Sequence, residues 1–287
     1  MPRTMVNGVE LFHDEVGSGE PVLLHYGYTG SHDVFLNEIA PRLADRYRCI
    51  VMDARGAGES APPADGYTIE QYTLDVIGMA DALGLDRVTY VGHSMGGGIG
   101  MQLGLEHADR LNKLVLVAPI PSGGTVPPPG QEEAAQALRE RNRALRADPN
   151  GRATMLRERK LMRVRDTADA YVEAALDRAL SVSEGHYEDS MEAMWTFNVT
   201  DRLGELTTPT LIMAGAADGL AVANVNDWQR LPNATLHVFS RVGHGVPGDV
   251  PEEFSAVLGD FLEHGVVNFQ TVQARVAEVM ATTAASS

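Results

Sequence analysis

Short apolar runs alternate with segments of helical period over much of this chain. Six of these runs predict β-strands, at residues 22–25, 49–52, 88–91, 114–118, 211–214 and 236–239. Most are apolar on both faces, which is typical of a parallel sheet covered by helices on each side. Residues 69–83 have helical spacing, with Thr68 and Gln71 placed as a capping box and Gly84 just past the end. The alternation predicts an α/β fold built on a doubly wound, mostly parallel sheet.

The alternation stops near residue 119. Residues 119–131 contain five Pro and three Gly, a composition typical of a linker. Only helical patterns follow, at residues 131–147, 152–164, 167–180 and 188–197, before strand signals resume at Thr210. We therefore predict an α/β core formed by residues 1–120 and 201–265. Between its two parts we predict an inserted all-helical lid at residues 121–200 that lies over a sheet edge, and after them a C-terminal helix or tail at residues 266–287.

The composition is that of an ordinary globular protein. Of the 287 residues, 44% are apolar and 22% are charged, which excludes disorder of the chain as a whole. The 39 acidic residues outnumber the 23 basic ones, so the net charge is −16. Because clustered Lys and Arg bind phosphate backbones, this charge argues against a nucleic-acid partner, and it also argues against an anionic membrane surface.

Cys49 is the only cysteine, so the chain has no intrachain disulfide and no cysteine-rich metal site. It lies in an apolar run, which predicts a buried and unreactive thiol. The first eight residues lack the apolar core of a signal peptide, and no run approaches the ~18 apolar residues of a membrane span. These features predict a cytoplasmic protein that does not enter a membrane.

The strand predicted at residues 88–91 leads into a G-x-S-x-G motif, in which Gly92 and Gly96 flank Ser94, and a helical pattern follows. A strand, a sharp turn and a helix are the setting in which this motif presents a nucleophile. The turn brings the residues two before and two after the serine close to neighbouring backbone, so larger side chains would clash there. Ser94 would stand at a helix N-terminus, where the helix dipole favours negative charge. We predict that Ser94 is a nucleophile.

A nucleophilic serine requires a base, and the base requires an acid that orients it. Asp218 follows the strand predicted at residues 211–214, and His244 follows the strand at residues 236–239. The 26 positions that separate them leave room for one helix, at residues 222–231, and one strand. Both side chains would then emerge at the sheet edge that carries Ser94. We predict His244 as the base and Asp218 as its partner.

The other histidines have simpler interpretations. His237 lies inside a predicted strand and is expected to be structural, and His93 adjoins Ser94 but is expected to point elsewhere on so tight a turn. His25 lies near the mouth of the expected site. No strand-end acid is placed to orient the remaining ones, which are His13, His32, His107, His186 and His264.

The order of strands, serine turn, helical insertion, acid and histidine resembles that of the α/β-hydrolase superfamily, over about residues 5–265. In that family one loop usually reads His-Gly-x, and x donates its N–H to the oxyanion hole. Here the loop reads Tyr26-Gly27-Tyr28, so the resemblance implies Tyr28 as one donor, beside the N–H of Met95 that follows the nucleophile. The usual histidine is replaced by Tyr26, with His25 one position earlier. Residues 53–60 also resemble a structural loop of the family.

Residues 56–61 satisfy the G-x-G-x-x-A pattern of a dinucleotide-binding loop as well. Such a loop requires a helix that opens directly there, whereas Pro62 and Pro63 follow here and prevent regular helix continuation. The sequence has no H-E-x-x-H motif and no Walker loop. We expect neither a cofactor nor a metal ion.

The predicted lid carries two features that bear on a substrate. Residues 139–165 contain ten basic and three acidic side chains, a local charge of +7 that either solvates a helix surface or attracts an anionic substrate. Met191, Met194 and Trp195 recur at helical spacing and either pack against the sheet or line a pocket. Further candidates for the pocket lining, by their loop position near Ser94, are His25, Tyr26 and Tyr28.

A serine nucleophile disfavours epoxide hydrolysis and dehalogenation, which enzymes of this family perform with a carboxylate. The predicted reaction is hydrolysis of a small-molecule carboxylic ester or lactone through an acyl-Ser94 intermediate. Amide hydrolysis, C–C bond hydrolysis and cofactor-free perhydrolysis would use the same three residues and stay open as alternatives. A ligand receptor that keeps a hydrolase triad is an alternative from another functional class.

Overall fold

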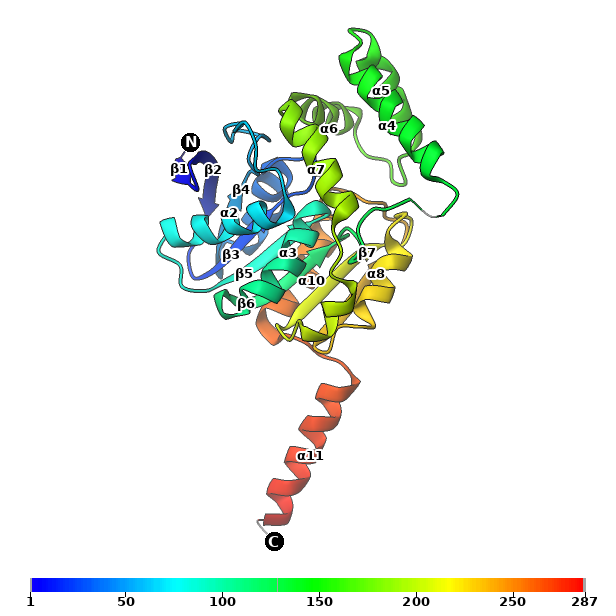
Figure 1. The fold of residues 1–287 in the computed structure, drawn as a ribbon. Helices are drawn as coiled ribbons and strands as arrows, with labels where there is room; N and C mark the ends of the chain where they lie inside the picture. Colours follow the sequence, from blue (N-terminus) through cyan, green and yellow to red (C-terminus); the bar gives the residue numbers. More distant parts are fainter. Residues whose placement is uncertain (1, 128, 286–287) are drawn as a thin grey trace.

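The computed structural model describes residues 2–127 and 129–285, and these residues form one eight-stranded sheet with helices around it (Figure 1). The strands are β1 (Arg3–Val6), β2 (Val9–Val16), β3 (Glu20–His25), β4 (Tyr47–Met52), β5 (Val88–His93), β6 (Leu111–Val117), β7 (Thr210–Gly215) and β8 (Ala234–Phe239). Their order in the sheet is β1-β2-β4-β3-β5-β6-β7-β8. Strands β3 to β8 are parallel, and the pairs β1–β2 and β2–β4 are antiparallel. The predicted α/β fold with a mostly parallel sheet is confirmed.

The hairpin of β1 and β2 is absent from the six predicted strands. Its turn, Asn7-Gly8, has positive φ at both residues (48° and 80°), which is typical of a tight hairpin turn of type I′. Strand β2 exposes Glu10 and Glu15, so it has no continuous apolar run. The Asn7-Gly8 pair is the sequence feature that would have predicted this hairpin.

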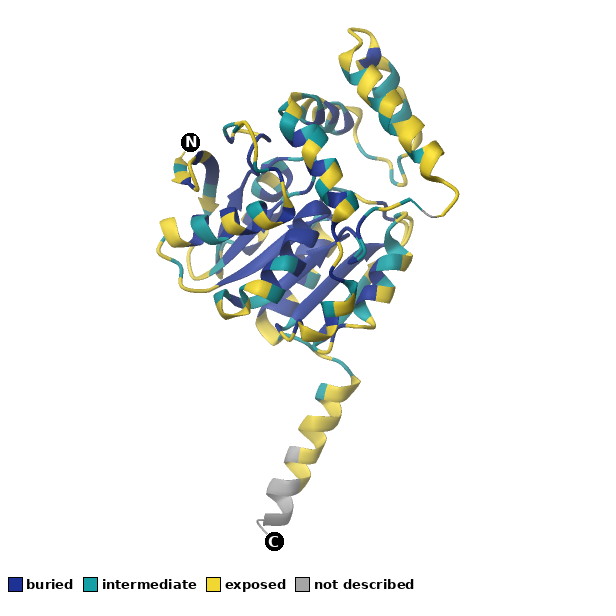
Figure 2. Ribbon diagram, viewed as in Figure 1, coloured by how far each residue is buried: buried dark blue, intermediate teal, exposed yellow. Residues whose placement is uncertain are grey.

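Helices cover both faces of the sheet, because successive strand residues point to opposite sides. In β6, Leu114 and Leu116 pack on one face, whereas Val115 and Val117 pack on the other. The first face is covered by α2 (Ile69–Ala82) and α3 (Met95–Glu106), and the second by the π-helical turn η1 (Phe35–Ile39), α1 (Ala40–Leu43) and α10 (Pro251–His264). Shorter helices complete the core: η2 (Ala108–Arg110), η3 (Thr200–Glu205), α8 (Ala221–Trp228) and α9 (Val246–Asp249). The central strands, β3 to β7, are accordingly the most deeply buried elements (Figure 2).

Cys49 lies in the core on the second face. Its side chain is fully buried, as predicted from its apolar run. Burial raises the pKa of the thiol to about 12, which leaves almost no thiolate at neutral pH.

Helix α2 begins at the predicted cap. The Thr68 hydroxyl accepts a hydrogen bond from the Gln71 backbone N–H at 3.1 Å. The Gln71 side chain donates to Asp75 instead, so only half of the predicted capping box is formed. The helix ends before Gly84, which has a φ of +68°.

Four α-helices of the described chain, followed by the short helix η3, stand between β6 and β7, where the insertion is predicted: α4 (Glu132–Ala147), α5 (Gly151–Leu161), α6 (Asp169–Ser181) and α7 (Glu184–Thr196). Helix α7 begins earlier than predicted and packs on the core, where the Ser190 hydroxyl lies 2.6 Å from the Tyr72 hydroxyl of α2. Helices α4 and α5 lie side by side, project beyond the core and expose most of their residues (Figures 1 and 2). The insertion is therefore anchored at α7 and extends outward at α4 and α5.

The last helix, α11 (Phe269–Ala285), points away from the body of the molecule (Figure 1). It exposes apolar side chains, among them those of Phe269, Val272, Val276 and Met280. In the part of the chain that the structure describes, no helix is both long and apolar enough to cross a membrane.

Candidate active site

Ser94 stands at the turn between β5 and α3 in a strained backbone conformation. Its φ of 57° and ψ of −114° are rare for a residue with a side chain. Neighbouring backbone holds this conformation, because the Ser94 N–H donates to the Val117 carbonyl (2.9 Å) and the Ser94 carbonyl accepts from the N–H groups of Gly97 (2.9 Å) and Ile120 (3.1 Å). Such strain is commonly found at functional residues that the surrounding structure fixes in place.

The two motif glycines are required by close backbone contacts. A Cβ on Gly92 would lie 2.1 Å from the Gly96 carbonyl oxygen, and a Cβ on Gly96 would lie 2.7 Å from the His25 carbonyl oxygen. Both distances are shorter than real Cβ contacts. The steric reason predicted for these glycines is confirmed.

The structure brings Ser94, His244 and Asp218 into one hydrogen-bonded series. His244 Nε2 lies 2.9 Å from Ser94 Oγ, and His244 Nδ1 lies 2.8 Å from Asp218 Oδ2. Asp218 follows β7 and His244 follows β8, so the carboxyl ends of parallel strands place all three at one edge of the sheet. Since an ionised carboxylate only accepts, Nδ1 carries the ring proton and Nε2 accepts from the serine hydroxyl.

The Asp218 carboxylate is held in its charged form. Burial would raise its pKa, but the hydrogen bond and charge of His244 and a hydrogen bond from the Leu220 N–H (3.1 Å) outweigh burial, so the pKa lies below its usual value. The side chain of Asp218 is only 5% exposed, whereas that of His244 is 42% exposed. A fixed, buried acid therefore supports a ring that is open to solvent.

The loop after β3 lies directly on the serine turn. A Cβ on Gly27 would lie 2.6 Å from Ser94 Cβ and 3.3 Å from the Met95 nitrogen. The backbone N–H groups of Tyr28 and Met95 donate to no residue that the structure describes. The Tyr28 hydroxyl donates to the Tyr187 carbonyl of α7 at 2.6 Å, which ties this loop to the insertion. Two N–H groups beside Ser94 are thus available to donate to an oxygen atom of a bound molecule.

A cavity of about 280 Å³ opens beside Ser94 and His244. Tyr26 and Tyr28 contribute to its lining, at the positions where the loop predicts them. The other lining residues are Thr29, Gly30, Ser31, Val34, His93, Arg159, Tyr171, Ala175, Arg178 and Gly245. Helices α5 and α6 supply Arg159, Tyr171, Ala175 and Arg178, none of which stands out in the sequence as an individual site residue.

His25 does not line this cavity, although its loop position predicts that it does. Its side chain is 1% exposed and its Nδ1 lies 3.0 Å from the Tyr90 hydroxyl, on the core side of the loop. Burial, and to a lesser extent the charge of His186, lowers its pKa to about 3. The side chain of a strand's last residue points to one face of the sheet, and the sequence does not specify which face.

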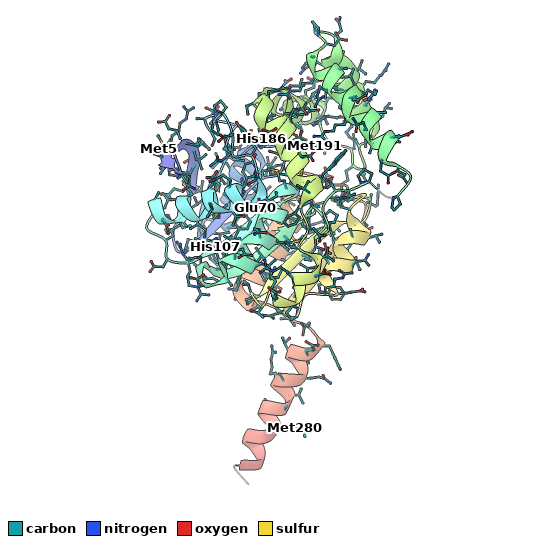
Figure 3. The ribbon with its side chains drawn as sticks, in the orientation of Figure 1. Met5, Glu70, His107, His186, Met191 and Met280 are labelled. Carbon is teal, nitrogen blue, oxygen red and sulfur yellow. The ribbon has the colours of Figure 1, made fainter. Side chains whose placement is uncertain are left out.

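Met191, Met194 and Trp195 are likewise separate from Ser94. Met194 packs in the core, which is one of the two alternatives for this stripe. Met191 and Trp195 line a different groove, between α4 and α7. Figure 3 shows Met191 on α7, close to His186 of the same helix. Helical spacing placed these residues along α7, but the packing of α4 decided what they face.

His93 lies closer to the site than expected. Its Nε2 donates to the His244 carbonyl at 2.8 Å, and the two rings lie 5.0 Å apart. Burial and the neighbouring His244 lower the pKa of His93 to about 3, so the ring is neutral at physiological pH. His93 therefore positions the backbone of His244, and its adjacency to Ser94 was the signal for that contact.

His32 has a strand-end acid, contrary to expectation. Asp53 directly follows β4, and its Oδ2 lies 2.8 Å from His32 Nδ1. The same carboxylate accepts hydrogen bonds from the backbone N–H groups of His32 (2.7 Å) and Glu59 (2.9 Å). This pair holds two loops together outside the cavity of Ser94.

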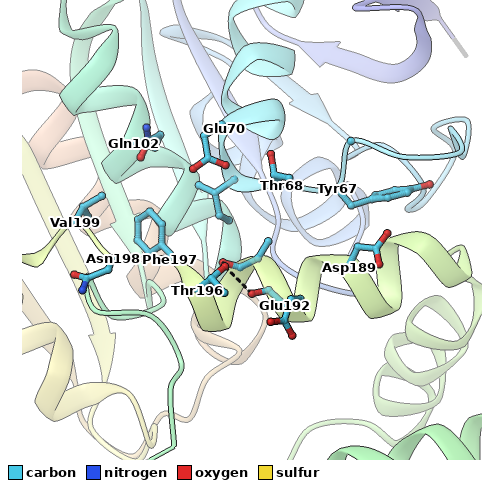
Figure 4. A pocket seen from close by; sticks show the side chains of 13 residues that line it. Tyr67, Thr68, Glu70, Gln102, Asp189, Glu192, Thr196, Phe197, Asn198 and Val199 are labelled. Carbon is cyan, nitrogen blue, oxygen red and sulfur yellow. Dashed lines mark hydrogen bonds between the residues drawn. The ribbon is translucent and has the colours of Figure 1, made fainter.

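A larger cavity, of about 520 Å³, lies between α2, α3 and α7 (Figure 4). Glu70, Asp189 and Glu192 contribute to its lining, but Ser94, His244 and Asp218 do not. Among the residues that the structure describes, no group of three or more His, Cys, Asp or Glu side chains is placed to hold a metal ion.

The chain is similar to known hydrolases over most of its length. The family model for the alpha/beta hydrolase fold matches residues 20–249. The putative carbamate hydrolase RutD of Caulobacter sp. (strain K31) is 30% identical over 269 residues, which cover 88% of this chain and 95% of that protein. 2-hydroxy-6-oxononadienedioate/2-hydroxy-6-oxononatrienedioate hydrolase 1 of Dechloromonas aromatica (strain RCB) is 30% identical over 277 residues, covering 89% and 91%. The solved structure of Est816, an N-acyl homoserine lactone degrading enzyme, has a TM-score of 0.74 at 29% identity and covers 91% of this chain and 100% of its own.

Proposed function

This chain belongs to the α/β-hydrolase family, and from that membership we propose that it is a serine hydrolase that cleaves a carboxylic ester or a lactone through an acyl-Ser94 intermediate. The observation that carries the proposal is the series Ser94, His244 and Asp218, linked at 2.9 and 2.8 Å beside a cavity. The lactone-degrading activity named for Est816 supports a lactone among the substrates. Helices α5 and α6 act in this proposal as the lid over Ser94.

The reaction begins when the Ser94 hydroxyl oxygen attacks the carbonyl carbon of the substrate. His244 Nε2 takes the hydroxyl proton, while Asp218 accepts the Nδ1–H and so keeps Nε2 as the acceptor. The N–H groups of Tyr28 and Met95 donate to the oxyanion that forms. His244 then protonates the leaving oxygen, the C–O bond breaks, and the acyl-Ser94 ester remains. In a lactone the released alcohol stays attached to the acyl group.

Water completes the cycle. His244 takes a proton from water as its oxygen attacks the acyl carbon, and the same two N–H groups hold the second oxyanion. When this intermediate collapses, the proton returns to Ser94 Oγ and the carboxylic acid leaves. Each proton that His244 takes is given back, so the cycle consumes only substrate and water.

A second candidate is hydrolysis of a carbamate or of a C–C bond, supported by the names of the two relatives at 30% identity. In both reactions Ser94 attacks a carbonyl group, as in ester hydrolysis. The leaving atom that His244 must protonate is then nitrogen or carbon instead of oxygen. A panel of p-nitrophenyl esters of increasing chain length, lactones, amides, a carbamate and a vinylogous diketone distinguishes these reactions by relative kcat/KM.

Replacement of Ser94 by Ala tests the proposal. We expect Ser94→Ala and His244→Ala to lower kcat by about 10⁴–10⁶-fold, and Asp218→Asn to lower it equally or less, because these groups act as one unit. A fluorophosphonate should label the wild-type protein at Ser94 alone and abolish its activity. The matched control is Ser240→Ala at an exposed serine, which should keep both activity and labelling.

Thermal melting of each variant shows whether the fold is intact. Ester hydrolysis near the wild-type rate by a folded Ser94→Ala protein would refute the acyl-Ser94 intermediate. Mapping of the fluorophosphonate adduct to another residue would refute the assignment of the nucleophile.

A further inference from the structure

The cavity beside Ser94 has one wall with positive charge. Arg159 of α5 and Arg178 of α6 face the same space as Ser94 and His244. No described residue of the lining is Asp or Glu. The charge of this wall contrasts with the net charge of −16 for the whole chain.

The other basic side chains of residues 139–165 are mostly paired. Seven of the ten basic side chains have a carboxylate within ion-pair distance. These carboxylates come from α5, α6 and α7, and each ion pair is partly exposed. The pairs are Arg139–Glu192, Arg141–Glu158, Arg143–Glu188, Arg146–Glu184, Arg152–Asp177, Lys160–Asp169, Lys160–Glu173 and Arg163–Asp169. Arg165 donates to the Arg241 carbonyl (3.2 Å). Ion pairing on a solvated helix surface accounts for these residues.

Arg159 differs from them in burial and in pairing. Its side chain is half-buried in the cavity wall and has no hydrogen bond or ion pair to a described residue. Burial, and then the like charge of Arg178, lowers the pKa of its guanidinium. A half-buried cation without a protein partner is unfavourable, so the arrangement favours an anion that enters the cavity.

Arg178, in contrast, already has an anionic partner. Its Nε lies 3.5 Å from Asp33 Oδ2, and this carboxylate also accepts a hydrogen bond from the Ser31 hydroxyl at 2.6 Å. The wall therefore presents about one uncompensated positive charge. A monoanion matches that charge, whereas the dianion of a phosphate ester would bring a second charge without a partner.

We infer that Arg159 binds a carboxylate of the substrate, with Arg178 beside it, so that this hydrolase selects small esters or lactones that carry a free carboxylate. The identity of the cleaved bond, an ester or a lactone, rests on the proposed function. The planar guanidinium matches a carboxylate through two parallel N–H donors, and a partly desolvated site strengthens such hydrogen bonds. A cavity of about 280 Å³ limits the substrate to a small molecule.

Two substrates that differ in one group test the inference. Mono-p-nitrophenyl glutarate ends in a carboxylate where p-nitrophenyl pentanoate ends in a methyl group, and both release p-nitrophenol. Arg159→Gln should lower the ratio of kcat/KM for the glutarate to kcat/KM for the pentanoate by about tenfold or more, with spontaneous hydrolysis subtracted. Arg159→Lys should retain part of the preference. Arg157→Gln is the matched control, because Arg157 is exposed on the same helix outside the cavity, and it should leave the ratio within about twofold of wild type.

Equilibrium binding separates this inference from the proposed reaction. Calorimetry with monomethyl glutarate should show a Kd about tenfold weaker for Ser94→Ala/Arg159→Gln than for Ser94→Ala alone. If wild-type protein hydrolyses no ester but binding still depends on Arg159, the reaction is wrong and the carboxylate site stands. If Arg159→Gln lowers kcat/KM equally for both esters and leaves the Kd unchanged, the carboxylate site is overturned and the hydrolase stands. An effect of Arg157→Gln as large as that of Arg159→Gln would also overturn it, in favour of unspecific surface charge.

Discussion

Gly27 lies against the turn that carries Ser94, so the site requires a residue without a side chain there. A Cβ at this position would lie 2.6 Å from Ser94 Cβ and 2.7 Å from the His93 carbonyl oxygen. At such distances one of the two segments must move. Since the next residue, Tyr28, carries one of the proposed oxyanion donors, the movement would separate that donor from the substrate.

We therefore expect Gly27→Ala to lower kcat for a p-nitrophenyl ester by about 10²-fold, the loss typical of a displacement of ~1 Å in a catalytic group. The melting temperature should change little. Gly204→Ala is the control, because a Cβ on Gly204 would meet no atom within 4 Å, and its kcat should equal that of wild type. Wild-type kcat in a folded Gly27→Ala protein would show that this loop does not hold the oxyanion donor.

The helices of this molecule differ in how firmly they are attached. Helix α10 buries Phe254, Leu258 and Phe261 in the core on the second face of the sheet. Helix α11 projects from the body, and two of its apolar side chains, those of Phe269 and Met280, are 74% and 68% exposed. Because burial of apolar surface is the main source of stability, α10 contributes to the fold and the exposed residues of α11 do not.

A chain that ends at Asn268 should accordingly keep its fold and its function. We expect its melting temperature to stay within ~2 °C of the full chain, since a change of 1 kcal/mol shifts the melting temperature of a protein of this size by about 2 °C. We expect kcat/KM for a p-nitrophenyl ester to stay within about twofold. A chain that ends at Val250, without α10, should not fold. A large loss of melting temperature or activity on removal of α11 would show that this helix packs on the body or on a second copy in solution.

Three buried histidines couple the stability of the whole molecule to pH. Burial, which acts together with neighbouring charges, lowers the pKa of His25 and His93 to about 3 and that of His186 to about 4. In the unfolded chain the pKa of each is about 6.5. Below pH 6.5 the unfolded chain therefore binds protons that the folded chain does not. The stability is fully present above pH 6.5 and is lost as the pH falls from there toward the folded pKa values.

Between pH 7 and pH 5 we expect each of these histidines to lower the free energy of unfolding by about 2 kcal/mol, at about 1.4 kcal/mol per pH unit below 6.5. Urea unfolding at the two pH values measures this loss. His186→Gln should reduce this loss by about 2 kcal/mol, the contribution of one histidine, whatever its effect on the free energy of unfolding at pH 7. His264→Gln, at an exposed histidine, should leave the loss unchanged. An equal loss in wild type and His186→Gln would contradict the assignment of a neutral, buried ring.

The parallel sheet and the main chemistry of the site follow from short-range patterns. The G-x-S-x-G motif can be recognised from a few neighbouring residues. Gly92 is required by the Gly96 carbonyl in the same turn, and Gly96 is required by the end of the adjacent strand β3. The sequence alone predicts that Asp218 and His244 lie near Ser94, since residues that follow parallel strands meet at one edge of the sheet. Continuous apolar runs predict buried strands, whereas the β1–β2 hairpin was not predicted because polar residues interrupt the apolar positions of β2.

The lining of the cavity depends on contacts between segments that are far apart in the chain. Helical spacing puts Met191 and Trp195 along α7, but it does not specify their neighbours, and they line a groove with α4 and not the cavity of Ser94. His25 ends its strand beside the site, yet its side chain packs toward Tyr90. Arg159 is one of ten basic residues in a single charged run, and only its place in the lining of the cavity beside Ser94 sets it apart. Periodicity describes the residues that share a face of an element, whereas the partner of that face is chosen by the packing of the whole molecule.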